Sequence, residues 1–332
     1  MIVAARRCRD IRAGTDPGKL FDFRFNPRCN KGGKNMRATP TARRFVALTV
    51  ALFVLALVAS IGASTASADP VNGSDRNGTY LALGDSVAFG YVPPQAVPAP
   101  NYLVARSFVG YPDLVAQQLG VRVSNAACPG ETTASLLFAG AQSNGCENSL
   151  GSPVGYATQY PLHVQYQGTQ IDYALHYLAA HKHTRLVTID IGANDAFLCQ
   201  QTTVHHCTSP AELAGVANEI AGNLGTIFHD LRVVAGYQGP IVALTYYSLS
   251  YSDPIQVAVS QFLDSVIASV TTAYGGIVAD GFAAFEGPSI PFGGDPCAAG
   301  LLIKLPDGTC NIHPSPAGHR LLAQAILAAL GP

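Results

Sequence analysis

Four residues of this sequence are of the types that acyl transfer requires: Ser86, His313, Gly130 and Asn194. A serine hydroxyl is a weak nucleophile, and a histidine within hydrogen-bonding distance must take its proton as it attacks an acyl carbon. The tetrahedral oxyanion then needs preorganised donors, and a backbone N–H at a glycine and an asparagine amide are suited to that task. Together the four residues would supply a nucleophile, a base and oxyanion donors.

Each of the four also has an ordinary structural explanation when it is taken alone, as a helix cap, a turn glycine or a residue of a surface loop. Their positions relative to the predicted elements favour the catalytic interpretation. Ser86, Gly130 and Asn194 follow the first, second and third predicted strands, and His313 lies in a loop before the last predicted helix. Because ligands of α/β sheets bind outside the carboxyl ends of the strands, we expect all four at one edge of one sheet.

Strand-like and helix-like segments alternate along the chain. Apolar runs predict strands over residues 79–83, 121–125, 185–191, 241–246 and 277–281. Helices are predicted over residues 111–119, from 131, over 170–181, 210–234 and 255–274, and from 316. Every strand is separated from the next by a crossover long enough for a helix. The sequence therefore predicts an α/β fold, a three-layer α/β/α sandwich around a parallel five-stranded sheet.

Residues 1–68 have the character of a leader. Arg43-Arg44 precede an apolar stretch over residues 45–61, and Ala66-Ser67-Ala68 follow it, which is the order of a secretory signal peptide. We expect translation to begin at Met36 and cleavage near Ala68. An uncleaved membrane anchor is the alternative, since the apolar stretch approaches spanning length. A short linker over residues 69–78 then leads to one domain over residues 79–332.

The charge of the mature chain limits its partners. Residues 1–68 hold 12 of the 20 basic residues and three of the 21 acidic ones, so residues 69–332 keep 8 basic and 18 acidic groups, a net charge of −10. A domain with this net negative charge lacks the basic surface that binds a phosphate backbone, so we expect no nucleic-acid binding.

Cysteine usage agrees with export. Two of the eight cysteines fall in the leader, which leaves Cys128, Cys146, Cys199, Cys207, Cys297 and Cys310. No two are spaced C-x-x-C, which argues against a zinc ribbon or a thioredoxin-type motif. Six cysteines allow 15 pairings, and proximity favours 128 with 146, 199 with 207, and 297 with 310. The paired histidines at 181 and 183 and at 205 and 206 lack nearby acidic or free cysteine ligands, so we expect neither a metal nor a cofactor.

Four stretches of the chain resemble the SGNH or GDSL hydrolases. They are Ala82-Leu83-Gly84-Asp85-Ser86, Ala127-Cys128-Pro129-Gly130, Gly192-Ala193-Asn194-Asp195, and His313-Pro314 with Gly318-His319 behind it. The resemblance spans residues 79–330 and implies a flavodoxin-like sheet. It implies Ser86 as nucleophile and first oxyanion N–H, Gly130 and Asn194 as the other oxyanion donors, and His313 as general base. Secreted lipases and esterases of this family commonly carry three local disulfides.

One position departs from the family pattern. The family usually has an aspartate three residues before the histidine, and Cys310 stands there in this chain. A branch of the family orients the imidazole by a main-chain carbonyl instead, and the resemblance to that branch favours the Cys310 carbonyl. Asp307, six residues before His313, is the alternative.

The sequence therefore predicts a secreted hydrolase of lipid or other acyl esters that works through an acyl-enzyme on Ser86. Alternatives are a carbohydrate O-acetyl esterase of the same fold, a non-catalytic envelope binding module, and an α/β-hydrolase, whose G-x-S-x-G motif Ala88 breaks. Residues 91–111 and 246–251 follow strands at the catalytic end, where they could wall an acyl pocket. We expect a monomer that acts on a small or lipid ester, with transient contact to a lipid surface.

Overall fold

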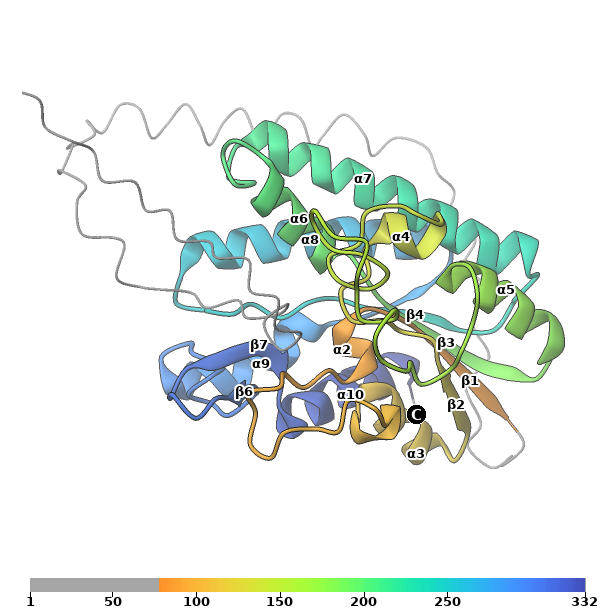
Figure 1. Ribbon diagram of the computed structural model, residues 1–332, viewed down its shortest axis with the longest axis horizontal. Coiled ribbons are helices and arrows are strands. Elements are labelled where there is room, and N and C mark those ends of the chain that lie inside the picture. Colours follow the sequence, from red (N-terminus) through yellow and green to blue (C-terminus); the bar gives the residue numbers. More distant parts are fainter. Residues whose placement is uncertain (1–77, 332) are drawn as a thin grey trace, which may run out of the picture. The chain divides into compact units, whose positions relative to one another are not determined.

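Apolar runs form the parallel strands of one sheet in the computed structural model, which describes residues 78–331. The strands are β1 (Thr79–Gly84), β2 (Arg122–Asn125), β3 (Thr184–Asp190), β4 (Ile241–Leu244) and β5 (Ile277–Ala279). They pair in the order β2-β1-β3-β4-β5 (Figure 1). This is the expected five-stranded, flavodoxin-like arrangement. The leader, the start at Met36, cleavage near Ala68 and residues 69–77 of the linker lie outside the described residues.

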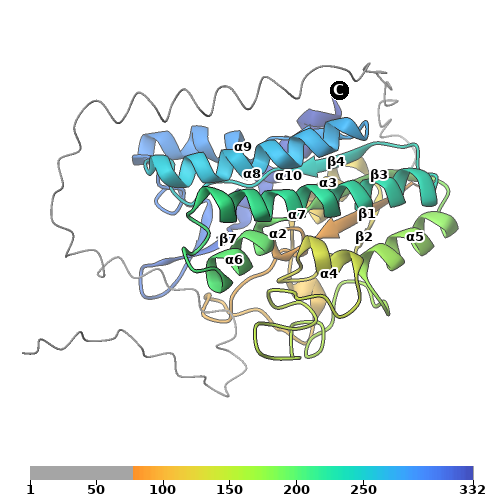
Figure 2. The ribbon, with the colours of Figure 1, turned by 90° about the horizontal axis from the view of Figure 1, so that it is seen from above.

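Helices cover both faces of the sheet, which makes the fold the expected α/β/α sandwich (Figures 1 and 2). On one face lie α3 (Tyr111–Leu119), α9 (Gly281–Ser289) and α10 (Pro316–Leu330). On the other lie α4 (Thr133–Leu137), α5 (Gln170–Ala180), α6 (Ala193–Thr202), α7 (Pro210–His229) and α8 (Pro254–Ala273). Shorter segments are α2 (Ser86–Phe89), the 3₁₀ turns Ala105–Ser107 and Ile290–Phe292, and a π-helical turn, Asp230–Val234, that continues α7.

The core is divided by the sheet into two apolar layers. Successive residues of β1 alternate between them: Tyr80 and Ala82 belong to one layer, and Leu81 and Leu83 to the other. This is the period of two that a strand imposes on its side chains, and burial on both faces explains why the strands are continuous apolar runs. The strands are therefore fixed in place from two sides, and their carboxyl ends form a rigid edge.

A two-stranded antiparallel hairpin stands apart from this sheet and was missed from the sequence. Its strands are β6 (Leu302–Lys304) and β7 (Cys310–Pro314). The intervening Leu305-Pro306-Asp307-Gly308-Thr309 closes on itself through a hydrogen bond from the Leu305 N–H to the Thr309 carbonyl, and Gly308 has a φ of 85°. The prediction that His313 lies in a loop is thus wrong, because His313 belongs to β7.

Other boundaries differ by a few residues. Strand β4 ends at Leu244 rather than at residue 246, so Tyr246 lies in the segment that follows it. Among the described residues, α8 alone has the length and mean hydropathy of a membrane-spanning helix, and it packs on α7 and on strands β4 and β5. The three disulfides join the predicted partners: Cys128 to Cys146, Cys199 to Cys207, and Cys297 to Cys310.

Candidate active site

Ser86 occupies the sharp turn between β1 and α2. It is the first residue of α2, and Asp85 caps that helix by accepting a hydrogen bond from the Val87 N–H at 2.9 Å. Gly84 has a φ of 139°, and a Cβ at this position would lie 2.2 Å from the Asp190 carbonyl oxygen. Only glycine fits this approach to the end of β3. Ser86 is the one half-buried residue between Leu81 and Gly90, so it is partly exposed at the sheet edge.

Gln170, at the start of α5, fixes this turn from the side. Its side chain accepts a hydrogen bond from the Gly84 N–H at 2.8 Å and donates one to the Gly84 carbonyl at 2.9 Å. It also donates to the Glu131 carboxyl at 2.7 Å. No local sequence pattern indicates this role, because the two partners are 86 residues apart.

The hairpin brings His313 to the nucleophile. His313 Nε2 accepts a hydrogen bond from Ser86 Oγ at 2.8 Å, although the two residues are 227 positions apart. The imidazole is 8% exposed, and the ring of Tyr91 lies against it with 4.8 Å between the centroids. Burial, with a smaller effect from His319, lowers the pKa of His313 to about 3. The imidazole is therefore neutral over the physiological range and free to accept a proton.

Asn311 orients the imidazole, and neither sequence-based candidate does. His313 Nδ1 donates to Asn311 Oδ1 at 2.5 Å, and the His313 N–H donates to the same oxygen at 3.1 Å. The Asp307 carboxylate instead accepts from the N–H and the hydroxyl of Thr309 in the hairpin turn. The expected Cys310 carbonyl is replaced for a geometric reason: in a strand, residues two apart share a face. Asn311 therefore stands beside His313, whereas Cys310 is bonded to Cys297.

Asn194 lies in the first turn of α6, and its amide is held at both ends. Its Nδ2 donates to the Asp85 carboxylate at 3.2 Å, and its Oδ1 accepts from Asn144 Nδ2 at 3.0 Å. Asn144 in turn donates its backbone N–H to the Gly130 carbonyl at 2.7 Å. The two residues expected to donate to an oxyanion are thus connected through Asn144, which sequence reasoning missed.

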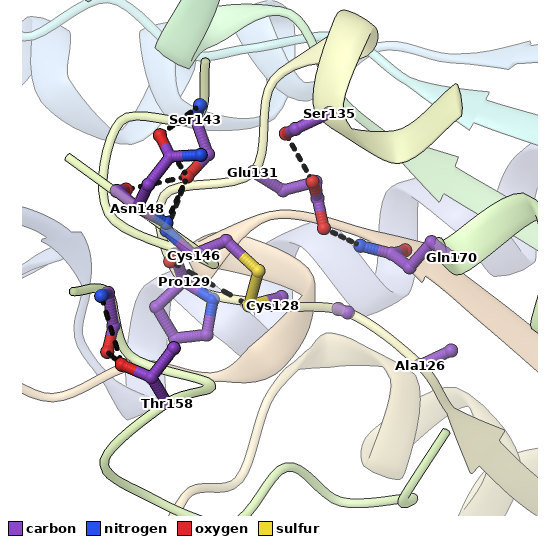
Figure 3. Close-up of a disulfide and its surroundings, with 12 residues drawn as sticks. Ala126, Cys128, Pro129, Glu131, Ser135, Ser143, Cys146, Asn148, Thr158 and Gln170 are labelled. Atoms are coloured by element: carbon purple, nitrogen blue, oxygen red, sulfur yellow. Dashed lines mark hydrogen bonds between the residues drawn. A yellow bond between two sulfur atoms is a disulfide. The ribbon is translucent and has the colours of Figure 1, made fainter. Parts of the chain in front are cut away.

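The turn that carries Gly130 is pressed against the loop that contains Asn144. Gly130 has a φ of 86°, and a Cβ there would lie 2.7 Å from backbone atoms of Asn144 and Gly145. The Cys128–Cys146 disulfide ties the two ends of this region together, and Glu131, beside it, reaches Ser135 and Gln170 (Figure 3). The disulfide and the glycine together fix the backbone at the end of β2.

Two buried carboxyl groups, those of Asp85 and Asp190, lie near the turn that carries Ser86. Burial raises the pKa of Asp85 to about 6, although hydrogen bonds from Tyr246, Val87 and Asn194 oppose this. Burial and the neighbouring Asp85 raise the pKa of Asp190 well above its ordinary value. Burial thus favours the protonated form more strongly at Asp190 than at Asp85, and the Asp85 carboxyl is the one that accepts a hydrogen bond from the Asn194 amide.

The aromatic side chains of the two segments that could have walled an acyl pocket are packed into the protein. Tyr91 and Phe108 are buried, and they pack with Phe89, Tyr102 and Tyr156 in one aromatic cluster. After β4, the hydroxyls of Tyr246, Tyr247 and Tyr251 each donate a hydrogen bond to another segment. These side chains hold the fold together at the catalytic end instead of lining an open pocket.

One group of the described residues has the composition of a metal site, namely Cys128, Glu131 and Cys146. Both of its sulfur atoms are joined in the disulfide. A disulfide sulfur is not a thiolate ligand, so this group does not fit a metal ion.

Comparison with known proteins places the chain in a family. The model of the GDSL-like Lipase/Acylhydrolase family matches residues 82–321, which include all four expected site residues. No protein of curated function matches the sequence. The chain is similar in structure to a phospholipase A1 from Streptomyces albidoflavus NA297, at 19% identity over 76% of this chain and 99% of the other, with a TM-score of 0.47. It is also similar to an acetylxylan esterase from Geobacillus stearothermophilus, at 18% identity over 77% and 94%, with a TM-score of 0.43. The chain belongs to the GDSL-like lipase/acylhydrolase family.

Proposed function

We propose that this protein hydrolyses carboxylic esters through an acyl-enzyme on Ser86. The observation that carries the proposal is the 2.8 Å hydrogen bond from Ser86 Oγ to His313 Nε2. As Oγ attacks the ester carbonyl carbon, Nε2 takes the hydroxyl proton, and the Asn311 amide oxygen holds Nδ1–H in place. The imidazolium then gives its proton to the departing alcohol. Water, deprotonated by His313, attacks the acyl-enzyme and releases the acid.

The oxyanion of each tetrahedral intermediate would be bound by the Ser86 N–H, the Gly130 N–H and Asn194 Nδ2. Support for these roles comes from the way their positions are fixed before substrate arrives. Asp85 caps the turn of Ser86 and aligns Asn194, and Asn144 links Asn194 to Gly130. Donors that need no reorganisation are the most effective in stabilising developing charge.

We further propose that the acyl part of the substrate is apolar. Residues 86–105 contain no charged side chain, and they include the segment that packs its Tyr91 ring on His313. On that segment, Val97 is 80% exposed and Leu103 is 74% exposed. Exposed apolar side chains on the segment that contacts the base favour an acyl chain longer than acetyl and transient contact with lipid. A carbohydrate O-acetyl esterase is the alternative outcome.

The place of action that we propose is outside the cytoplasm. Three disulfides indicate an oxidising compartment. The proposed route is secretion from a start at Met36, with cleavage near Ala68. N-terminal sequencing of the secreted protein would test the route: a mature chain that starts near Asp69 is expected, and a retained apolar segment would instead mean an anchor.

Enzymatic activity can be tested with a fluorophosphonate label and a nitrophenyl ester series. The purified wild-type protein should be labelled at Ser86, and acyl chains longer than acetyl should be cleaved with higher kcat/KM than acetyl. Ser86→Ala should lose labelling and about 10⁶-fold in turnover while melting normally, because no core atom is removed. A variant that keeps more than a few per cent of activity would refute the nucleophile. Preference for an acetylated glycan over every nitrophenyl ester would refute the proposed substrate class.

A further inference from the structure

Two adjacent tyrosines after β4 reach the two halves of the candidate site. The Tyr246 hydroxyl donates to Asp85 Oδ2 at 2.6 Å, and Asp85 directly precedes Ser86. The Tyr247 hydroxyl donates to the Ile312 carbonyl at 2.7 Å, and Ile312 directly precedes His313. The bonds cross 161 and 65 positions of the sequence.

We propose that Tyr246 and Tyr247 are positioning residues that set the distance between Ser86 and His313. The inference rests on the proposed function and extends it to residues that touch neither substrate nor reacting atoms. It explains why two neighbouring tyrosines bind, through their hydroxyls, the residue before Ser86 and the residue before His313.

The need for such a connection follows from the topology. Ser86 is carried by the central sheet through β1, whereas His313 is carried by the separate β6–β7 hairpin. No strand pairing joins the hairpin to the sheet in the described part of the chain. The Tyr246–Tyr247 segment is separated from β4 by one residue, Thr245, so its hydroxyls link the base to the same edge of the sheet that holds the nucleophile.

The tyrosine pair is itself held in place by contacts with two helices. The Tyr246 N–H donates to Asp264 Oδ1 of α8 at 2.9 Å. The Tyr247 ring is stacked on Phe285 of α9, with 4.2 Å between centroids and 13° between planes. One tyrosine is thus anchored to a helix on one face of the sheet, and the other to a helix on the opposite face. A support that cannot move can hold its partners to a narrow geometry.

Tyr246 also acts on the oxyanion side. The Asp85 oxygen to which it donates is the one that accepts from Asn194 Nδ2. Loss of the tyrosine hydroxyl would leave this buried carboxylate with fewer donors and free it to shift. Ser86 and Asn194 would then move relative to each other, since Asp85 is bonded to both the turn of Ser86 and the Asn194 amide.

The test uses Tyr246→Phe and Tyr247→Phe in the full-length protein, with Tyr251→Phe as the matched control. Tyr251 lies in the same segment, and its hydroxyl, like that of Tyr247, donates to a backbone carbonyl, that of Phe282, at 2.8 Å. Each substitution removes one oxygen and keeps the ring. kcat, KM, the rate of fluorophosphonate labelling and the melting temperature are measured for all four proteins.

We expect kcat and the labelling rate of the two site variants to fall together by about tenfold or more, while KM changes by less than about threefold. The control Tyr251→Phe should keep kcat within about twofold, even if its melting temperature falls as much as those of the two site variants. The double variant Tyr246→Phe/Tyr247→Phe should lose less than the product of the single losses, because both bonds restrain one distance.

Two results would overturn the inference, and they are distinguishable. If the wild type is labelled at Ser86 but the site variants match Tyr251→Phe in kcat and labelling, the tyrosines are merely structural. If the wild type is neither labelled nor active, the proposed function fails and the inference fails with it.

Discussion

Asn311→Asp is the most informative single change at the base, because it replaces an amide by a carboxylate of almost the same shape. Asn311 Oδ1 accepts from both Nδ1 and the backbone N–H of His313, and an aspartate can accept both bonds. What changes is the charge beside the imidazole. A carboxylate favours the imidazolium, so the pKa of His313 should rise from its depressed value of about 3.

The size of the shift follows from Coulomb's law. With about 4 Å between charge centres and an effective dielectric constant of about 20, the attraction is about 4 kcal/mol, equivalent to about 3 pKa units. Asn311 is only 7% exposed, and the desolvation of the new carboxylate offsets part of this. We therefore expect a rise of between about one and about three units.

The assay is an NMR titration of the His313 ring, assigned by comparison with His313→Ala, together with kcat/KM across pH. The ring of Asn311→Asp should protonate at higher pH, and the acid limb of kcat/KM should move up with it. At alkaline pH, where His313 is neutral in both proteins, the variant should keep kcat within about tenfold.

Asn311→Ala is the matched variant that removes the acceptor. It takes away a hydrogen bond to a ring that becomes charged during attack, worth about 1.5–3 kcal/mol, so kcat should fall about 10- to 100-fold at every pH. If Asn311→Asp leaves the His313 titration unmoved and Asn311→Ala keeps kcat within about threefold, Asn311 does not orient the base.

Three further predictions concern the surroundings of the site. Asp307→Asn should change kcat by less than about tenfold, because Asp307 binds Thr309 in the hairpin turn. A loss of kcat near 10⁴-fold in a variant with a normal Tm would instead make Asp307 the third member of a catalytic triad. Replacing Cys297 and Cys310 by serine opens a loop of 13 positions, which should lower the free energy of unfolding by about 3 kcal/mol and Tm by about 6–12 °C. It should also reduce kcat, because β7, which carries His313, starts at Cys310. An unchanged kcat would mean that the hairpin holds the base without the disulfide. Burial raises the pKa of Asp264 from 3.8 to about 7, so its proton is bound more tightly in the folded state, and the stability this provides below about pH 4 is lost as pH rises from about 4 to about 7. Asp264→Asn should therefore reduce the fall in stability, measured as Tm, between about pH 4 and about pH 7, and an equal fall in both proteins would contradict the assignment.

The hairpin was the feature of the fold that sequence reasoning missed, although the signal was present. Pro306-Asp307-Gly308 between two apolar segments is a turn signature, and it does connect β6 to β7. Treated as a strand, residues 310–314 would have placed Asn311 beside His313 by the period of two. The sequence-based prediction rests instead on the family resemblance, which points to the Cys310 carbonyl, and it is wrong because Asn311 accepts the bond.

Other features follow from the sequence alone because their causes are local. The apolar runs and crossovers determined the sheet and its two covering layers. The glycine-flanked serine, the Gly130 turn and the Asn194 block lie at strand ends because strand length and turn residues are encoded nearby in the chain. The disulfide partners are close in sequence, so proximity predicted them.

Only the tertiary structure decided which side chains support the site. Gln170 on Gly84, Tyr246 on Asp85 and Tyr247 on Ile312 are contacts between residues 65 to 161 positions apart. Nothing in the local pattern distinguishes these tyrosines from ordinary packing residues, because a hydroxyl gains its role from the acceptor it meets. Local periodicity determines which face a side chain occupies, whereas its partner depends on how distant elements pack.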